Sequence, residues 1–307
     1  MELNQKTLDK PVIIVGKGLH SGRIVRMEIL PAKAHNGITF ERTDTGAAAV
    51  KASIENVSST ELSTTIGVGL QTVNTIEHVM AAFHGLGIDN AHIRLNGPEV
   101  PIMDGSAEPF MKRFVEAGIT SLRSFRKFWV VQKPFEVKVG ESYIRVAPSK
   151  RLTIRCSINF SKDVIGYQTL DFEHTAQNFA YVATARTFCH IDDVQDMRRR
   201  GLALGGSLQN AVVVTDRGIM NEGGLRGDNE FVRHKLLDLV GDIFLLDGFL
   251  LGSIVVHKPG HSLHAEFLRR LVDEPGVVRC ISGARFAEAE DEATSQPFDL
   301  PAYVSFA

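Results

Sequence analysis

Residues 230–242, "EFVRHKLLDLVGD", carry the pattern that decides how the second half of this chain folds. Apolar side chains recur there at the three- and four-residue spacing of an amphipathic helix. Polar side chains recur every four residues, so they fall along one face: Glu230, His234, Asp238 and Asp242. The stretch therefore predicts a buried helix, spanning about 229–246, with a single polar face.

The polar face of this helix has two interpretations. Taken alone, three acids and a histidine are most simply a solvated face. Against that, like charges four residues apart repel by about 0.2–0.5 kcal/mol per pair, and Arg233 and Lys235 lie off the face. A bound cation would relieve this repulsion. His234 and Asp238 place an imidazole nitrogen beside a carboxylate oxygen, which suits two zinc ligands, but catalytic zinc takes three from the protein.

The best candidate for the third ligand lies in "TIEH" at 75–78, at the start of another predicted helix. His78 could complete a His/His/Asp set, and Glu77 could take a proton from water that attacks a substrate. As an isolated pair, the two would be ordinary helix residues. Four other histidines compete as ligands, and the residues alone do not exclude them: His20, His84, His92 and His190.

Two further residues have a chemical interpretation and a plain one. His261 follows Gly260 at a predicted loop-to-helix junction, where a side chain can project into a cleft. As an imidazolium it could stabilise an oxyanion or protonate a leaving amine; otherwise it is a surface histidine or, with His264, part of a helix cap. Cys189 adjoins a histidine, but nothing in the sequence marks its thiol as activated.

The two halves of the chain repeat one order of predicted elements: strands, a helix, a strand and a helix. In the first half, "AHNG" at 34–37 predicts a hairpin turn between the second and third strands. The repeated order predicts two similar α+β domains, residues 1–124 and 125–307. If they pack with approximate two-fold symmetry, the two long helices meet at their interface, a usual place for an active site.

Composition excludes several classes of protein. The 307 residues are 44% hydrophobic and 23% charged with a formal net charge of -2, so no basic field indicates nucleic acid or an anionic membrane. Three widely separated cysteines indicate neither a disulfide framework nor a metal knuckle. The amino-terminal stretch does not have the pattern of a signal peptide, and no apolar run is long enough for an integral membrane segment. We expect a soluble, cytoplasmic protein, with no oligomeric partner indicated.

Seven stretches occur in a fixed order along nearly the whole chain: "GKGLHSG" at 16–22, "TIEHVMAAFHGLGIDNAHI" at 75–93, "PEVPIMDGSAEPF" at 98–110, "ARTFC" at 185–189, "LALGGSLQNAVVV" at 202–214, "NEFVRHKLLDLVGD" at 229–242 and "GHSL" at 260–263. Together they make the chain closely similar to the UDP-3-O-acyl-N-acetylglucosamine deacetylases, the zinc amidases of lipid A biosynthesis in Gram-negative bacteria.

The resemblance implies a fold and a reaction. The fold is a β-α-α-β sandwich, in which each domain pairs a sheet with two helices and the helix layers face each other. A β-α-β insert near 187–214 forms a passage for an acyl chain. The reaction is zinc-dependent hydrolysis of the 2-acetamido group of UDP-3-O-(3-hydroxyacyl)-N-acetylglucosamine, a small-molecule substrate, with release of acetate.

The resemblance also implies roles for individual residues. Three correspond to the zinc ligands: His78, His234 and Asp238. Glu77 corresponds to the general base acting on zinc-bound water, and His261 to the general acid and oxyanion stabiliser, oriented by Asp242. Three others correspond to a hydroxyl near the tetrahedral intermediate, an aromatic lining the substrate site and a cation contacting substrate: Thr187, Phe188 and Lys235, respectively. Glu230 is left with the role of a helix-start acid.

Some positions depart from the family pattern. Lys162 and Asp163 replace a His-Pro pair in "FSKDVIGYQ", "GHSLHA" replaces "GHALNN", and Ser63 stands where some members have a cysteine near the metal. The catalytic set is intact, but contacts at the substrate periphery are open. Two alternatives therefore stand beside the deacetylase: a zinc amidase acting on another substrate, and a non-catalytic protein that binds a UDP-sugar or lipid. A binder has no need of a base, a metal and an acid together.

Overall fold

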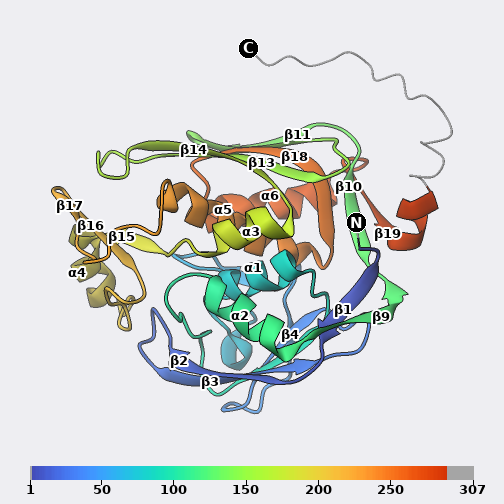
Figure 1. Cartoon of the computed structure of the whole chain (residues 1–307), viewed down its shortest axis with the longest axis horizontal. Helices are drawn as coiled ribbons and strands as arrows, with labels where there is room; N and C mark the ends of the chain where they lie inside the picture. Colours follow the sequence, from blue (N-terminus) through green and yellow to red (C-terminus); the bar gives the residue numbers. More distant parts are fainter. Residues whose placement is uncertain (1, 289–307) are drawn as a thin grey trace.

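Two β-sheets enclose a layer of helices in the computed structural model, which describes residues 2–288 (Figure 1). Among these residues, the first sheet has the strand order β2 (Val12–Lys17), β3 (Ile24–Pro31), β8 (Ala91–Leu95), β4 (Ile38–Arg42) and β5 (Val50–Lys51). The second has the order β11 (Phe135–Val139), β12 (Ser142–Ala147), β18 (Phe249–His257), β10 (Lys127–Val131) and β19 (Val278–Ser282), with β13 (Leu152–Asn159) pairing β18 and with β14 (Tyr167–Glu173).

The two sheets share one topology. In the first, β8 lies between β3, which is antiparallel to it, and β4, which is parallel to it. In the second, β18 lies between antiparallel β12 and parallel β13. In both halves the central strand comes late in the chain and is flanked by helices. The repeated order of elements in the sequence therefore corresponds to a repeated sheet, and the fold is the expected α+β sandwich.

The helices fill the space between the sheets (Figure 1). They are α1 (Glu77–Leu86) and α2 (Glu108–Ala117) from the first half, and α3 (Ala176–Ala183), α5 (Glu230–Ile243) and α6 (His261–Asp273) from the second. Helices α1 and α5 cross very closely at Gly241, where a β-carbon would lie 2.1 Å from the carbonyl oxygen of Glu77. Only glycine fits at this crossing, and the contact holds the start of α1 against α5.

Helix α5 is buried on nearly all sides because it lies between the two sheets and against α1, α3 and α6. Its apolar residues join the common core, which explains why the stretch is so rich in leucine and valine. Arg233 is also fully buried. It donates to the backbone oxygen of Tyr181 and to the hydroxyl of Thr184, at the end of α3. The helix continues into a 3₁₀ turn, η3 (Phe244–Leu246), so the predicted end near 246 is confirmed.

A small separate layer lies at one edge of the molecule (Figure 1, left). It consists of β15 (Phe188–His190), α4 (Ile191–Arg199), β16 (Val212–Thr215) and β17 (Gly218–Ile219). Strands β15 and β16 are parallel, as a β-α-β unit requires. This layer occupies the segment in which the insert was expected.

Several sequence-based expectations differ from the structure. The hairpin predicted at 34–37 is wrong, because β8 inserts between β3 and β4. Strands β1 (Asn4–Leu8) and β9 (Ile119–Phe125), which pair with each other, were not predicted, nor were the 3₁₀ turns η1 (Ile54–Asn56) and η2 (Gly69–Gln71). Strand β6 (Val57–Ser59) pairs with β7 (Thr65–Ile66), and β7 lies in a segment that the sequence predicts as a strand. The division at 124/125 stays a prediction. It falls near the end of β9, just before β10 enters the second sheet.

Among the described residues, no helix is both long and apolar enough to cross a membrane.

Candidate metal centre and acid–base pair

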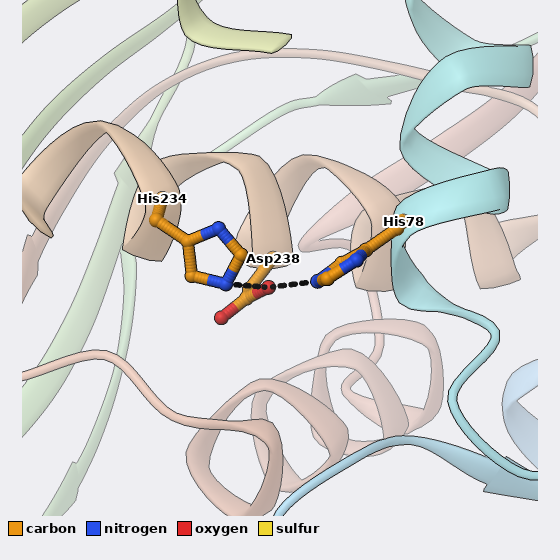
Figure 2. A group of neighbouring side chains, drawn as sticks. All are labelled: His78, His234 and Asp238. Carbon is orange, nitrogen blue, oxygen red and sulfur yellow. Dashed lines mark ion pairs between the residues drawn. The ribbon is translucent and has the colours of Figure 1, made fainter. Parts of the chain in front are cut away.

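The three residues expected to bind a metal lie together where α1 and α5 cross. His78 comes from the first turn of α1, and His234 and Asp238 come from consecutive turns of α5. Figure 2 shows both imidazoles directed at the Asp238 carboxylate. Oδ1 of Asp238 is 3.6 Å from Nε2 of His78 and 3.4 Å from Nε2 of His234. All three side chains are buried.

The spacing of these atoms fits a tetrahedral metal. Two ligand atoms that are each about 2.0–2.1 Å from a zinc ion lie about 3.4 Å apart in tetrahedral geometry. Oδ1 of Asp238 is buried and has no hydrogen-bond partner among the described residues. A buried carboxylate oxygen without a donor is costly unless a cation completes it. The three residues therefore have the spacing of a metal site and a buried carboxylate oxygen free to bind the ion.

Neighbouring groups leave His234 and Asp238 in a state suited to binding a metal. Nδ1 of His234 donates to the backbone oxygen of Ala185 at 3.1 Å, which leaves the lone pair of Nε2 free toward the carboxylate. Burial lowers the pKa of His234 to about 3, so the ring is neutral at pH 7. Lys235 donates to Oδ2 of Asp238 at 2.8 Å. The expectation that no cation relieves the polar face was therefore wrong, because the flexible lysine side chain reaches back to it.

Glu77 lies beside this group, at the first position of α1. Its Oε2 accepts a hydrogen bond from the backbone amide of Thr64 at 3.0 Å, and its Oε1 is 3.8 Å from Nε2 of His261. Burial raises the pKa of the carboxyl group, although the nearby imidazoles of His261 and His78 oppose the change. A carboxylate whose proton affinity is raised in this way is suited to accept a proton.

A second cluster lies one turn further along α5. Asp242 accepts hydrogen bonds on Oδ2 from Nδ1 of His261 and from Nδ1 of His264, each at 2.7 Å, and on Oδ1 from the hydroxyl of Thr64 at 2.6 Å. Burial alone would lower the pKa of His261, but the carboxylates of Asp242 and Glu77 raise it to about 9. His261 therefore carries a proton at neutral pH, with its Nε2 toward Glu77.

Glu230, the first residue of α5, anchors the segment that leads into the insert. Its buried carboxylate accepts from the backbone amide of Arg186 at 3.0 Å and from Nε of its guanidinium at 2.8 Å. Burial would raise the pKa of Glu230, but the hydrogen bonds from Arg186 and the amide of Arg226 lower it. Glu230 is therefore more than a helix-start acid, because it fixes the backbone immediately before Thr187 and Phe188.

Thr187 and Phe188 line an apolar cavity of about 300 Å³ between the insert and the main body. The cavity is also lined by His20 and by apolar side chains of α4 and β16, including Val194, Met197 and Val213. The centre of the Phe188 ring is 5.7 Å from Nζ of Lys235 and 6.2 Å from the centre of the His234 ring, so this ring lies beside the candidate metal ligands. The cavity thus begins beside the candidate centre and extends into the insert.

Sequence reasoning missed the place of His20. We considered it as a competing metal ligand, but it lines the cavity instead, and its Nε2 has no partner among the described residues. The loop that carries His20 is held by buried Glu99, whose two carboxylate oxygens accept hydrogen bonds from the backbone amides of His20 and Ser21, each at 2.8 Å. The buried glutamate two residues before Pro101 gave no signal in the sequence, because its partners are backbone amides about 80 residues away.

The other competing residues lie elsewhere. His92 bonds Glu41 on the first sheet, His84 packs against His174 near the far end of α1, and His190 contacts acids of the insert. Each is outside the group formed by the three expected ligands. Cys189 is not activated: burial raises the pKa of its thiol, which disfavours the thiolate that a nucleophile requires.

Comparisons with known proteins agree with this arrangement. A family model described as UDP-3-O-acyl N-acetylglycosamine deacetylase matches residues 5–273. The chain is 43% identical over 299 residues to a UDP-3-O-acyl-N-acetylglucosamine deacetylase of Geotalea uraniireducens, covering 97% of this chain and 96% of that protein. Enzymes of the same name from Campylobacter hominis and Acidithiobacillus ferrooxidans are 43% and 44% identical, over 85% and 88% of this chain and 89% and 90% of their own lengths.

The family match spans the first sheet, all of the second sheet except β19, the insert and every residue of the two clusters along α5. Agreement over nearly the full length of both chains leaves no large segment of either unmatched. The chain therefore belongs to the UDP-3-O-acyl-N-acetylglucosamine deacetylase family of amide hydrolases in lipid A biosynthesis.

Proposed function

We propose that this protein hydrolyses the 2-acetamido group of UDP-3-O-(3-hydroxyacyl)-N-acetylglucosamine in a zinc-dependent reaction that releases acetate. One observation supports this proposal above the others. A group with the spacing of a metal site lies beside a buried carboxylate and a protonated histidine, on the rim of an apolar cavity. Amide hydrolysis needs an electrophile, a base and an acid in one place.

His78, His234 and Asp238 are the residues that would hold the zinc ion. When bound, zinc supplies Lewis acidity, which polarises the amide carbonyl and makes water more acidic. The protein contributes the neutral imidazole of His234, held by Ala185, and the carboxylate of Asp238, partly neutralised by Lys235. Ser63 is buried and directly precedes Thr64, whose amide binds Glu77; as a serine it offers no thiolate that would add a further ligand.

Glu77 acts as the general base. Its Oε2 is held by the amide of Thr64, so Oε1 is the oxygen available to take the proton from the attacking water. The raised proton affinity of this buried carboxyl group makes the transfer more favourable than it would be for an exposed glutamate. The position of Glu77 next to His78 on α1 ties the base to the metal group.

His261 acts as the acid that stabilises the oxyanion and then protonates the departing amine. Its Nδ1–H is committed to Asp242 at 2.7 Å, so the Nε2 proton is the one it can give. An amine is a poor leaving group unless it is protonated, and a histidine with a pKa of about 9 holds that proton at neutral pH. Asp242 orients the ring and supplies the charge that keeps it protonated.

The cavity lined by Thr187 and Phe188 would take the acyl chain. Its wall is mostly apolar, which fits a hydrocarbon tail, and it starts where the hydroxyl of Thr187 and the ammonium of Lys235 can contact the sugar side of the substrate. A second hollow, lined by His261 and Lys258 among others, adjoins the acid on the other side. Its basic and hydroxyl-bearing lining suits the polar part of the substrate.

We also propose a cytoplasmic location for this activity. All three cysteines are free: Cys156, Cys189 and Cys280. Free thiols persist in a reducing compartment.

Acetate release from UDP-3-O-acyl-N-acetylglucosamine of increasing acyl length tests the function, with non-acylated UDP-N-acetylglucosamine as the control. Each methylene buried in the cavity is worth about 0.8 kcal/mol, or roughly fourfold in kcat/KM, until the cavity is filled. Equal rates on acylated and non-acylated substrates would contradict the acyl passage. No acetate from either substrate with zinc-loaded protein would contradict the function itself.

A further inference from the structure

Thr64 contacts both the proposed base, Glu77, and the Asp242–His261 pair, although it has no proposed role in proton transfer itself. Its backbone amide donates to Oε2 of Glu77 at 3.0 Å, and its hydroxyl donates to Oδ1 of Asp242 at 2.6 Å. The same hydroxyl oxygen is 3.1 Å from Nδ1 of His261. Resting on the deacetylation proposed above, we propose that Thr64 is a positioning residue that sets the distance and orientation between the base Glu77 and the Asp242–His261 pair.

The hydrogen-bonding capacity of the hydroxyl supports this role. A threonine hydroxyl has one proton, and the short contact with a carboxylate directs that proton toward Oδ1 of Asp242, which accepts it in a hydrogen bond. Oδ2 of the same carboxylate already accepts from His261 and His264. Thr64 therefore donates to the other oxygen, Oδ1, and prevents the carboxylate from rotating about its Cβ–Cγ bond. With that rotation fixed, Oδ2 stays in line with Nδ1 of His261.

The backbone of Thr64 ties the same residue to α1. Its carbonyl oxygen accepts from the amide of Ile76 at 3.3 Å, in the residue just before α1, while its amide holds Glu77. Thr64 directly precedes β7, which is paired with β6. It is almost completely buried, with 2% of its surface exposed. Thr64 thus binds the start of α1 through its backbone and Asp242 of α5 through its side chain.

Thr65 provides a matched control. It is the next residue, it is also buried, and its hydroxyl makes no hydrogen bond within the described part of the chain. Thr65→Val and Thr64→Val each replace a buried threonine hydroxyl by a methyl group of similar size. Thr64→Ser keeps the hydroxyl and removes only a methyl group. The three variants separate the loss of the hydrogen bond from the change in packing.

The experiment compares the zinc-loaded full-length variants in acetate release and in imidazole NMR. We expect Thr64→Val to lower kcat about 10- to 100-fold, because a hydrogen bond to a charged group is lost, with KM changed less than about twofold. Thr64→Ser and Thr65→Val should stay within about threefold of the wild type. Zinc content and thermal unfolding, measured on all variants, check that each one is folded and loaded.

The NMR readout does not depend on turnover. In ¹⁵N-histidine-labelled protein, the Nδ1–H resonance of His261 reports its hydrogen bond to Asp242. We expect this resonance to be unchanged in Thr64→Ser and shifted or broadened in Thr64→Val. An unchanged kcat and an unchanged resonance in Thr64→Val would overturn the proposal, as would failure of serine to restore kcat. If the wild type releases no acetate, the proposed function fails, while the NMR comparison still decides whether Thr64 positions the Asp242–His261 pair.

Discussion

Two clusters of the same composition lie one turn apart along α5, and their geometry suits opposite tasks. Each has two histidines and one aspartate, and all six side chains are buried. In the first, Nε2 atoms lie 3.4 and 3.6 Å from an oxygen of Asp238 that has no donor. In the second, Nδ1 atoms lie 2.7 Å from an oxygen of Asp242 and donate to it. The first spacing leaves room for a cation, and the second is that of a hydrogen bond.

The protonation of the histidines follows from this difference. Burial lowers the pKa of His234 to about 3, so it offers a lone pair. For His261 the same burial is outweighed by the carboxylates of Asp242 and Glu77, and its pKa rises to about 9. Residue type and burial therefore do not decide whether a histidine–aspartate cluster is suited to hold a metal or a proton. What decides is which nitrogen faces the carboxylate, and whether that carboxylate is already satisfied.

Removing Asp238 should break the first cluster and have the largest effect. We expect the wild type to bind about one zinc ion per chain tightly, and Asp238→Ala to lose both the metal and acetate release, by about 1,000-fold or more. Metal analysis after chelation and reloading measures the first, and a product assay the second. Glu77→Ala is the matched control: it should keep the metal while losing most turnover. A chelator-cleaned wild type with no high-affinity site would refute the assignment of the metal to this cluster.

Removing His261 should leave the first cluster intact, with a smaller loss. We expect His261→Ala to keep about one zinc ion per chain and to lose about 100-fold in kcat, because a positioned acid contributes about 10²–10⁴-fold. Zinc content and kcat are measured on the same preparation. Loss of zinc together with activity would reassign His261 as a ligand, and the distinction between the two clusters would then fail.

The sequence predicted those parts of these clusters that depend on local geometry. A four-residue spacing on one helix necessarily places His234, Asp238 and Asp242 on one face, so α5 and its polar face could be read directly. His78 and His261 come from other elements. Their place beside α5 was predicted only through the repeated order of the two halves and the resemblance to a family. The position of His78 depends on the close crossing of α1 and α5 at Gly241. Nothing in the sequence distinguishes this glycine from the other 26 as the point of the crossing.

Other features could not be predicted because they depend on contacts between distant residues or on rotamers. The hairpin predicted at 34–37 failed because β8 returns from α1 and inserts between β3 and β4. Lys235 points from the edge of the polar face back to Asp238, a choice of rotamer that spacing does not set. Helix α3 is different: Thr175 caps it and Phe179 and Val182 face the core, a signal that was present in the sequence and missed.

Asp242→Asn should have the most selective effect, on the second cluster alone. In the proposed reaction His261 must be protonated, so we expect wild-type activity to be retained below the pKa of about 9 and lost as the pH rises through it. Replacing the carboxylate by an amide removes the largest of the charges that raise this pKa, while burial, which lowers it, remains. The alkaline limb of the kcat–pH profile should therefore move down by about two units, with zinc content unchanged. Asp247→Asn is the control, since Asp247 pairs with Lys51 and Lys127 beyond the end of α5 and should leave the limb in place. An alkaline limb that stays near its wild-type pH in Asp242→Asn would show that His261 is not the group titrating there, and the contrast between a metal-holding and a proton-holding cluster would need another proton donor.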